Sequence, residues 1–101
     1  MATQRVIHHE DDPGPTPVTP NICDPFSAQL GAQVTFTGVS GTQTITQVGS
    51  VWPFTVASPM TVPNPATIHI KSSGLTVGQT YDYNVSQTCA NGIQKGVTII
   101  N

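Results

Sequence analysis

Short runs in which apolar and polar residues alternate, separated by turn-forming residues, make up most of the chain. The alternation is clearest at Ile68 and Ile70 and again at Tyr81, Tyr83 and Val85, each of which is flanked by polar or charged residues. Because successive side chains of a β-strand point to opposite faces of a sheet, this period of two indicates strands with one buried face. No stretch has a sustained helical period, so the pattern predicts an all-β fold.

Turn-forming residues divide the chain after residue 21 into segments rich in Val, Ile, Thr and Tyr, which are enriched in strands. Turn signals at intervals of roughly 8–12 residues are typical of a Greek-key β-sandwich, and we expect one of about seven strands. The strands are predicted at Ile22–Ala28, Ala32–Thr37, Thr42–Val48, Val51–Ala57, Ala66–Lys71, Gln79–Thr88 and Ile93–Ile100.

The N-terminal segment differs from the rest, because five of the nine prolines lie between Pro13 and Pro25. Proline fixes φ and lacks a backbone donor, so this segment cannot form a helix and is predicted to be extended or polyproline-like. We therefore divide the chain into a Pro-rich arm, residues 1–21, and a sandwich domain, residues 22–101.

Composition alone favours a disordered leader for the arm. The alternative is an arm held by a partner or a neighbouring copy, because prolines lower the entropy lost on immobilisation and need not complete a strand ladder. We adopt the second interpretation and expect residues 1–20 to dock in trans. The positions expected to contact the partner are Arg5, Val6, Ile7, His8, His9, Pro13, Pro15 and Pro17.

The chain of 101 residues can hold one compact domain and is too short for two. Charged residues make up 8% of it, with a formal net charge of -2, whereas about 25% is usual for a soluble domain. After Pro25 the charged residues are only Lys71, Asp82 and Lys95. This composition excludes a phosphate-binding surface and argues against nucleic acid or a membrane as partner. It predicts a surface of Thr, Gln, Ser and Asn. The free-energy cost of desolvating such a surface against a partner is small.

Leu75, Gly78 and Tyr81 stand at the spacing of Leu-x-Pro-Gly-x-x-Tyr, which is the E–F corner of fibronectin type III and related immunoglobulin-like modules. Val77 replaces the usual proline. The resemblance implies an immunoglobulin-like fold in which Tyr81 is buried and its hydroxyl is bonded to the backbone of the Ser72–Gly78 corner.

The single tryptophan departs from the fibronectin pattern, because Trp52 lies later in the chain than a strand-B Trp of that family. The segment around it, with Gly41–Ile45 ahead, is weakly similar to BACON modules of gut bacteria and their phages. The resemblance covers only the sandwich domain, and many functions share such an architecture.

Cys23 and Cys89 are separated widely enough to bridge the sheets of an immunoglobulin-like sandwich. The remaining signature is missing, since Gln87 rather than Tyr stands two before the second Cys and Trp52 is too far from the first. No signal peptide or membrane span is visible, so we expect a cytosolic chain with reduced cysteines. Export would favour the alternative, a disulfide.

The sequence contains no convincing catalytic constellation or metal site, so we expect no enzyme activity and no cofactor. Adjacent His8 and His9 on an extended chain point to opposite sides. His69 alternates with buried positions and is expected to face solvent or an interface. A Lys–Asn isopeptide bond would need Lys71 or Lys95 beside an Asn and a buried acid, and we expect none because only Asp82 could serve.

Two functions remain. The first is a structural assembly protein that resembles the auxiliary or decoration proteins of tailed-phage heads. It would be made in the host cytoplasm and attach to capsid subunits, or to copies of itself, in the virion. The second is a carbohydrate-binding or adhesion module of a bacterial surface or secreted protein, with Trp52, Phe54, Tyr81 and Tyr83 stacking on sugar rings. Its weakness is that such aromatic residues usually belong to a core.

Overall fold

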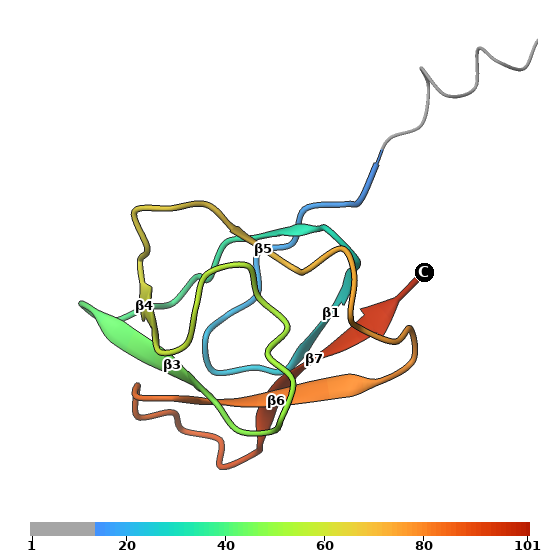
Figure 1. The fold of residues 1–101 in the computed structure, drawn as a ribbon. Coiled ribbons are helices and arrows are strands. Elements are labelled where there is room, and N and C mark those ends of the chain that lie inside the picture. Colours follow the sequence, from blue (N-terminus) through green and yellow to red (C-terminus); the bar gives the residue numbers. More distant parts are fainter. Residues whose placement is uncertain (1–13) are drawn as a thin grey trace, which may run out of the picture.

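The computed structural model describes residues 14–101, and within this range the protein is all-β without a helix. Two groups of strands face each other across the interior (Figure 1). The strands are β1 (Phe26–Gln29), β2 (Gln33–Val34), β3 (Gln43–Gln47), β4 (Met60–Val62), β5 (Ile68–His69), β6 (Thr80–Val85) and β7 (Lys95–Ile100).

Five strands form a mixed, curled sheet in the order β1-β7-β6-β3-β4. β1 runs parallel to β7, with Phe26 opposite Val97, whereas the other neighbours are antiparallel. β6 is the central strand, because Tyr83 lies opposite Gln47 of β3 on one side and Lys95 of β7 on the other.

The second layer is built on the antiparallel pair β2–β5, in which Val34 lies opposite Ile68. Isolated bridges extend this small sheet at both edges: Val18 pairs with Val34 in parallel, and Phe54 pairs with Ile70 in antiparallel fashion. The two layers together are consistent with a β-sandwich.

Seven strands are predicted and residues 14–101 contain seven, but the two sets differ. The expected strand at Val51–Ala57 contributes only the bridge from Phe54 to Ile70. Trp52, Pro53 and Phe54 are all buried, so the segment enters the interior and cannot alternate between a buried and an exposed face.

The strand missing from the prediction is β4, which Pro59 and Pro63 flank so closely that the sequence indicates a turn. Both prolines follow cis peptide bonds. The first expected strand, Ile22–Ala28, begins only at Phe26, because a turn closed by a hydrogen bond from the Asp24 amide to the Asn21 carbonyl precedes it.

Side chains that the alternation places inward form the core between the layers. Tyr81, Tyr83 and Val85 point to one face of β6, and Tyr83 is fully buried while the other two are half-buried. The fully buried side chains include Ile22, Ile45, Phe54, Met60, Val62, Ile70, Tyr83, Val97 and Ile99.

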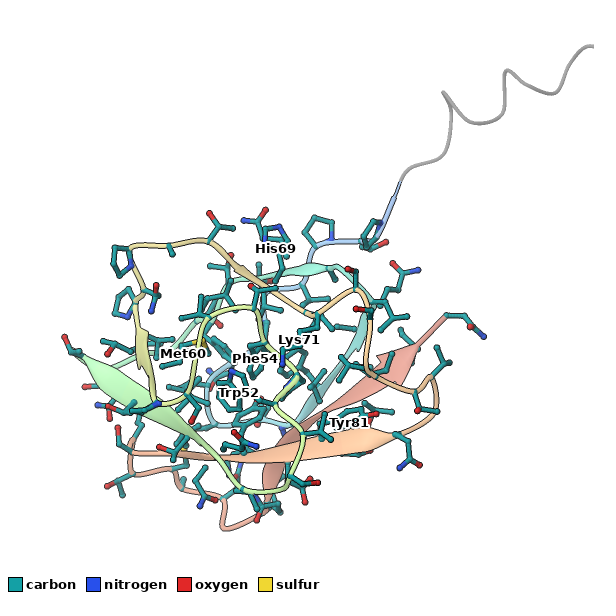
Figure 2. The ribbon with its side chains drawn as sticks, viewed as in Figure 1. Trp52, Phe54, Met60, His69, Lys71 and Tyr81 are labelled. Atoms are coloured by element: carbon teal, nitrogen blue, oxygen red, sulfur yellow. A yellow bond between two sulfur atoms is a disulfide. The ribbon has the colours of Figure 1, made fainter. Side chains whose placement is uncertain are left out.

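Phe54 is the centre of an aromatic cluster that joins the two layers. Its ring meets Trp52, Tyr83 and Phe36 edge to face, with ring centroids 5.2, 5.6 and 6.0 Å away. Such pairs contribute about 0.5–1.5 kcal/mol each beyond the burial of their area. Figure 2 shows Trp52 and Phe54 directed into the interior.

Tyr83 carries the one buried side-chain polar atom in residues 14–101 that has no hydrogen-bond partner, its hydroxyl oxygen. Burial raises the pKa of this hydroxyl above its ordinary range, because the ionised form would lose its hydration. The ring therefore contributes packing, while the hydroxyl carries an uncompensated desolvation cost.

Replacing Tyr83 by Phe is expected to raise the free energy of unfolding by about 1 kcal/mol, because the variant keeps the ring and loses an unpaired polar group. Urea unfolding of both proteins measures the difference. A destabilised variant would show that the hydroxyl has a hydrogen-bond partner in solution.

Candidate functional site

The arm is only partly described. Six of the positions expected to bind a partner lie outside the described residues: Arg5, Val6, Ile7, His8, His9 and Pro13. The other two, Pro15 and Pro17, are exposed. Between them, the amide of Thr16 donates to Oε1 of Gln29 at 2.6 Å, so the arm contacts β1 of its own chain from this point.

The last residues of the arm pair with the domain itself through isolated bridges, from Val18 to Val34 and from Asn21 to Thr37. The Val18 amide donates to the Gln33 carbonyl at 2.9 Å, and the Pro20 carbonyl accepts from the Thr37 amide at 2.8 Å. The expectation of docking in trans is therefore wrong for residues 18–20, and the expected boundary after residue 21 falls inside a paired segment. Proline lacks a donor but keeps its acceptor, so a Pro-rich segment with interspersed non-proline residues can pair along one edge.

Leu75 and Gly78 lie in the connection between β5 and β6, and Tyr81 is the second residue of β6. The Tyr81 hydroxyl accepts a hydrogen bond from the Thr76 amide at 2.7 Å, but Tyr81 is half-buried where the resemblance implies a buried ring. Gly78 has a φ of 95°, a left-handed conformation that glycine adopts without strain. Leu75 is partly buried and packs against the core.

The aromatic residues considered for sugar stacking are not available for it. Trp52, Phe54 and Tyr83 are buried in the core, and the Tyr81 hydroxyl is engaged in the corner. A stacking platform needs exposed ring faces, so these four residues do not form one.

His69 is half-buried on β5, at the rim of the molecule in Figure 2. Within residues 14–101, no three His, Cys, Asp or Glu side chains are close enough together to hold a metal ion. The described part of the chain also contains no helix long and apolar enough to cross a membrane.

Cys23 and Cys89 form a disulfide, with their Cα atoms 5.5 Å apart, so the prediction of two free thiols is wrong. The bridge joins the turn before β1 to the connection between β6 and β7. The Cys–Trp–Cys spacing belongs to a bridge between the interiors of two sheets. The Cys23–Cys89 bridge joins two loops, so that spacing does not apply to it. The parallel pairing of β1 with β7 brings these two loops together at one end of the sheet.

The outer face of the five-stranded sheet is exposed and nearly uncharged. The pairing places Ser27 beside Thr98, Thr98 beside Thr80, and Thr46 beside Asn84. The hydroxyls of Thr80 and Thr98 lie 2.7 Å apart and share a hydrogen bond. We call this surface the threonine face; it comprises Ser27, Thr44, Thr46, Thr61, Thr80, Asp82, Asn84 and Thr98.

Lys95 belongs to a polar cluster that the sequence did not reveal. Its side chain is 6% exposed, and its Nζ donates to Oδ1 of Asn91 at 2.8 Å and to the carbonyl of Ile93 at 2.5 Å. Asn91 in turn donates to the Cys23 carbonyl at 3.0 Å and to a carboxylate oxygen of Asp24 at 3.3 Å. The acid in contact with Asn91 is therefore Asp24, whereas Asp82 lies on the threonine face.

Replacing Tyr81 by Phe is expected to lower the free energy of unfolding by about 0.5–1.5 kcal/mol, because the Thr76 amide loses its acceptor while the ring still packs. Urea unfolding measures the loss, and Tyr83→Phe is the matched control because it removes a hydroxyl that has no partner. Equal stability of the Tyr81 variant and the parent would mean that the corner hydrogen bond contributes nothing.

Replacing both Cys23 and Cys89 by Ser is expected to cost about 2–4 kcal/mol, because the bridge closes a long loop and restricts the unfolded chain. The sequence separation it spans is 66 residues. Thermal unfolding with and without a reductant tests this: the reductant should lower the midpoint of the parent and leave that of the double variant unchanged. A reductant-insensitive parent would contradict the bridge.

In comparisons with known proteins, no protein-family model, no curated protein and no solved structure matches this chain.

Proposed function

We propose that this protein is a structural assembly module that attaches to other protein subunits through its threonine face, in the manner of an auxiliary or decoration protein on a virus particle. The observation that carries the proposal is the chemistry of that face, where Asp82 is the single charged residue. Burying hydroxyl and amide groups that can re-pair with a partner costs far less free energy than burying unpaired charges.

Proline residues lie at the strand edges of both layers. They favour a partner that packs on the threonine face over a partner that adds a strand at an edge. Exposed strand edges invite pairing with other chains, and proline blocks it because it removes a donor. Each edge has proline in or next to it: Pro17 and Pro20 at the Val18 edge, Pro53 at the Phe54 edge, Pro25 before β1, and Pro59 and Pro63 around β4.

The Cys23–Cys89 disulfide supports a function in a compartment outside the reducing cytosol. Disulfides persist on virion surfaces, on cell surfaces and in secreted proteins. The exterior of a virion is therefore the proposed location of the assembled protein, with a bacterial surface as the alternative.

The finer fold that we propose is immunoglobulin-like. β7, β6 and β3 lie in the order of strands G, F and C, and β2 pairs with β5 as strand B pairs with strand E. Two pairings depart from that fold, whose sheets are both antiparallel: the Val18 segment runs parallel to β2, and β1 runs parallel to β7.

The second candidate function, carbohydrate binding, has one observation in its favour. A groove of about 230 Å³ between β2 and the β4–β5 connection is lined by Phe36, Pro63 and Pro65 together with the polar side chains of Gln33 and Asn64. Its volume is below the roughly 300–1,000 Å³ of typical ligand sites, so it suits at most a single sugar ring.

The test of the assembly function is rebinding of the purified protein to native particles from which it has been stripped. The double variant Thr46→Arg/Thr61→Arg is expected to fold normally and to bind at least about tenfold more weakly, which corresponds to about 1.4 kcal/mol. Both positions are exposed on the threonine face. Two added charges there would be desolvated without partners.

The matched control is Ser50→Arg/Thr88→Arg, which adds the same charge at exposed positions outside the threonine face. Equal binding of both double variants would contradict the proposed surface. Binding of the parent to a glycan array, abolished by Phe36→Ala, would favour the carbohydrate function instead.

A further inference from the structure

We propose that the pocket beside the β6–β7 connection binds a small organic carboxylate through the buried lysine Lys95. The pocket has a volume of about 380 Å³, which is within the roughly 300–1,000 Å³ of typical ligand sites. It shares no lining residue with the groove between β2 and the β4–β5 connection. The inference does not depend on the proposed assembly function.

Lys95 is the cation that would hold the carboxylate. Its side chain is 6% exposed, and Nζ donates to two neutral oxygens, Oδ1 of Asn91 and the carbonyl of Ile93. All three residues line the pocket, so the ammonium group lies at the pocket wall. An ammonium group has three donors, and the two neutral oxygens use only two of them.

No carboxylate among residues 14–101 bonds this lysine. Asp24 bonds Asn91, on the Nδ2 side of that amide at 3.3 Å, and is exposed to solvent. Asp82 points to the other face of the sheet, because it precedes Tyr83 in β6 and Lys95 lies opposite Tyr83. Buried charges in proteins are normally paired with an opposite charge, and a ligand carboxylate would supply the partner that Lys95 lacks.

The rest of the pocket offers further donors and an apolar wall. None of the backbone amides of residues 88–93 donates a hydrogen bond to an acceptor in the described part of the chain. Val85, Cys89 and Ile93 contribute apolar surface to the lining. The Cys23–Cys89 disulfide holds the connection to the turn before β1, so the site is largely formed before a ligand enters, which lowers the entropy lost on binding.

The charge of the pocket selects a ligand with one negative charge. Lys95 is the only cation among the residues that line it, so a second charge, such as that of phosphate, would be desolvated without a partner. The apolar wall favours a carboxylate on an organic body, and Asn84 and Gln94 in the lining can bond its hydroxyl groups. D-glucuronate has these features and is a suitable probe, with D-glucose as the neutral compound of the same ring size.

Titration of the full-length, ¹⁵N-labelled protein with its disulfide intact tests the proposal through the amide resonances. We expect saturable shifts at residues 84–95 with D-glucuronate, and none with D-glucose at the same concentration and ionic strength. The proposal is overturned by equal shifts with both sugars, by the absence of saturable shifts with D-glucuronate, or by tighter binding of inorganic phosphate.

Variants assign the binding to Lys95. Lys95→Met keeps the apolar stem and removes the charge, and it is expected to bind D-glucuronate at least about tenfold more weakly than the parent. Lys71→Met is the matched control, because it removes the same charge from a half-buried lysine outside the pocket. Phe36→Ala, which alters the groove beside β2, should bind as the parent does.

Unchanged affinity in Lys95→Met, or loss of binding in Phe36→Ala, would place the ligand elsewhere and overturn the proposal. The comparison of D-glucuronate with D-glucose needs no variant, so it decides the question even where Lys95→Met fails to fold.

Discussion

The packing of Phe54 between the two layers is the interaction on which the rest of the structure depends. Its backbone belongs to the second layer through the bridge to Ile70, and its ring contacts Tyr83 of the five-stranded sheet. A chain of this size has one modest core, and the aromatic cluster around Phe54 occupies its centre. The same packing removes Trp52 and Tyr83 from the surface.

A second group of contacts, polar and covalent, holds the connection between β6 and β7 at one end of the five-stranded sheet. The disulfide links it to the turn before β1, Asn91 bonds the Cys23 carbonyl, and Lys95 inserts a long side chain beneath it. A connection of this length would otherwise be the least ordered part of the sheet.

The proline distribution and the surface chemistry act together. Prolines at the edges prevent the neutral strands from pairing indiscriminately with other chains, a particular risk in a domain with few charges to oppose aggregation. The threonine face stays open, because its backbone groups are already paired within the sheet and only side chains are presented. Such a surface binds a partner through complementary shape and through new hydrogen bonds from its hydroxyl and amide groups.

The period-two alternation in β5 and β6 determined the strands and their inward residues, because it depends only on the geometry of a single chain segment. The spacing of Leu75, Gly78 and Tyr81 likewise predicted a corner whose contacts are local in sequence. Both features could be predicted in advance.

The remaining features depend on which distant segments meet, and local patterns carry no information about that. The parallel pairing of β1 with β7 decided that Cys23 reaches Cys89 and that Asp24 contacts Asn91. Burial of the whole Trp52–Phe54 run decided that an apparent strand becomes core. Only the tertiary structure could decide these points, because each is a contact between residues that the chain itself keeps far apart.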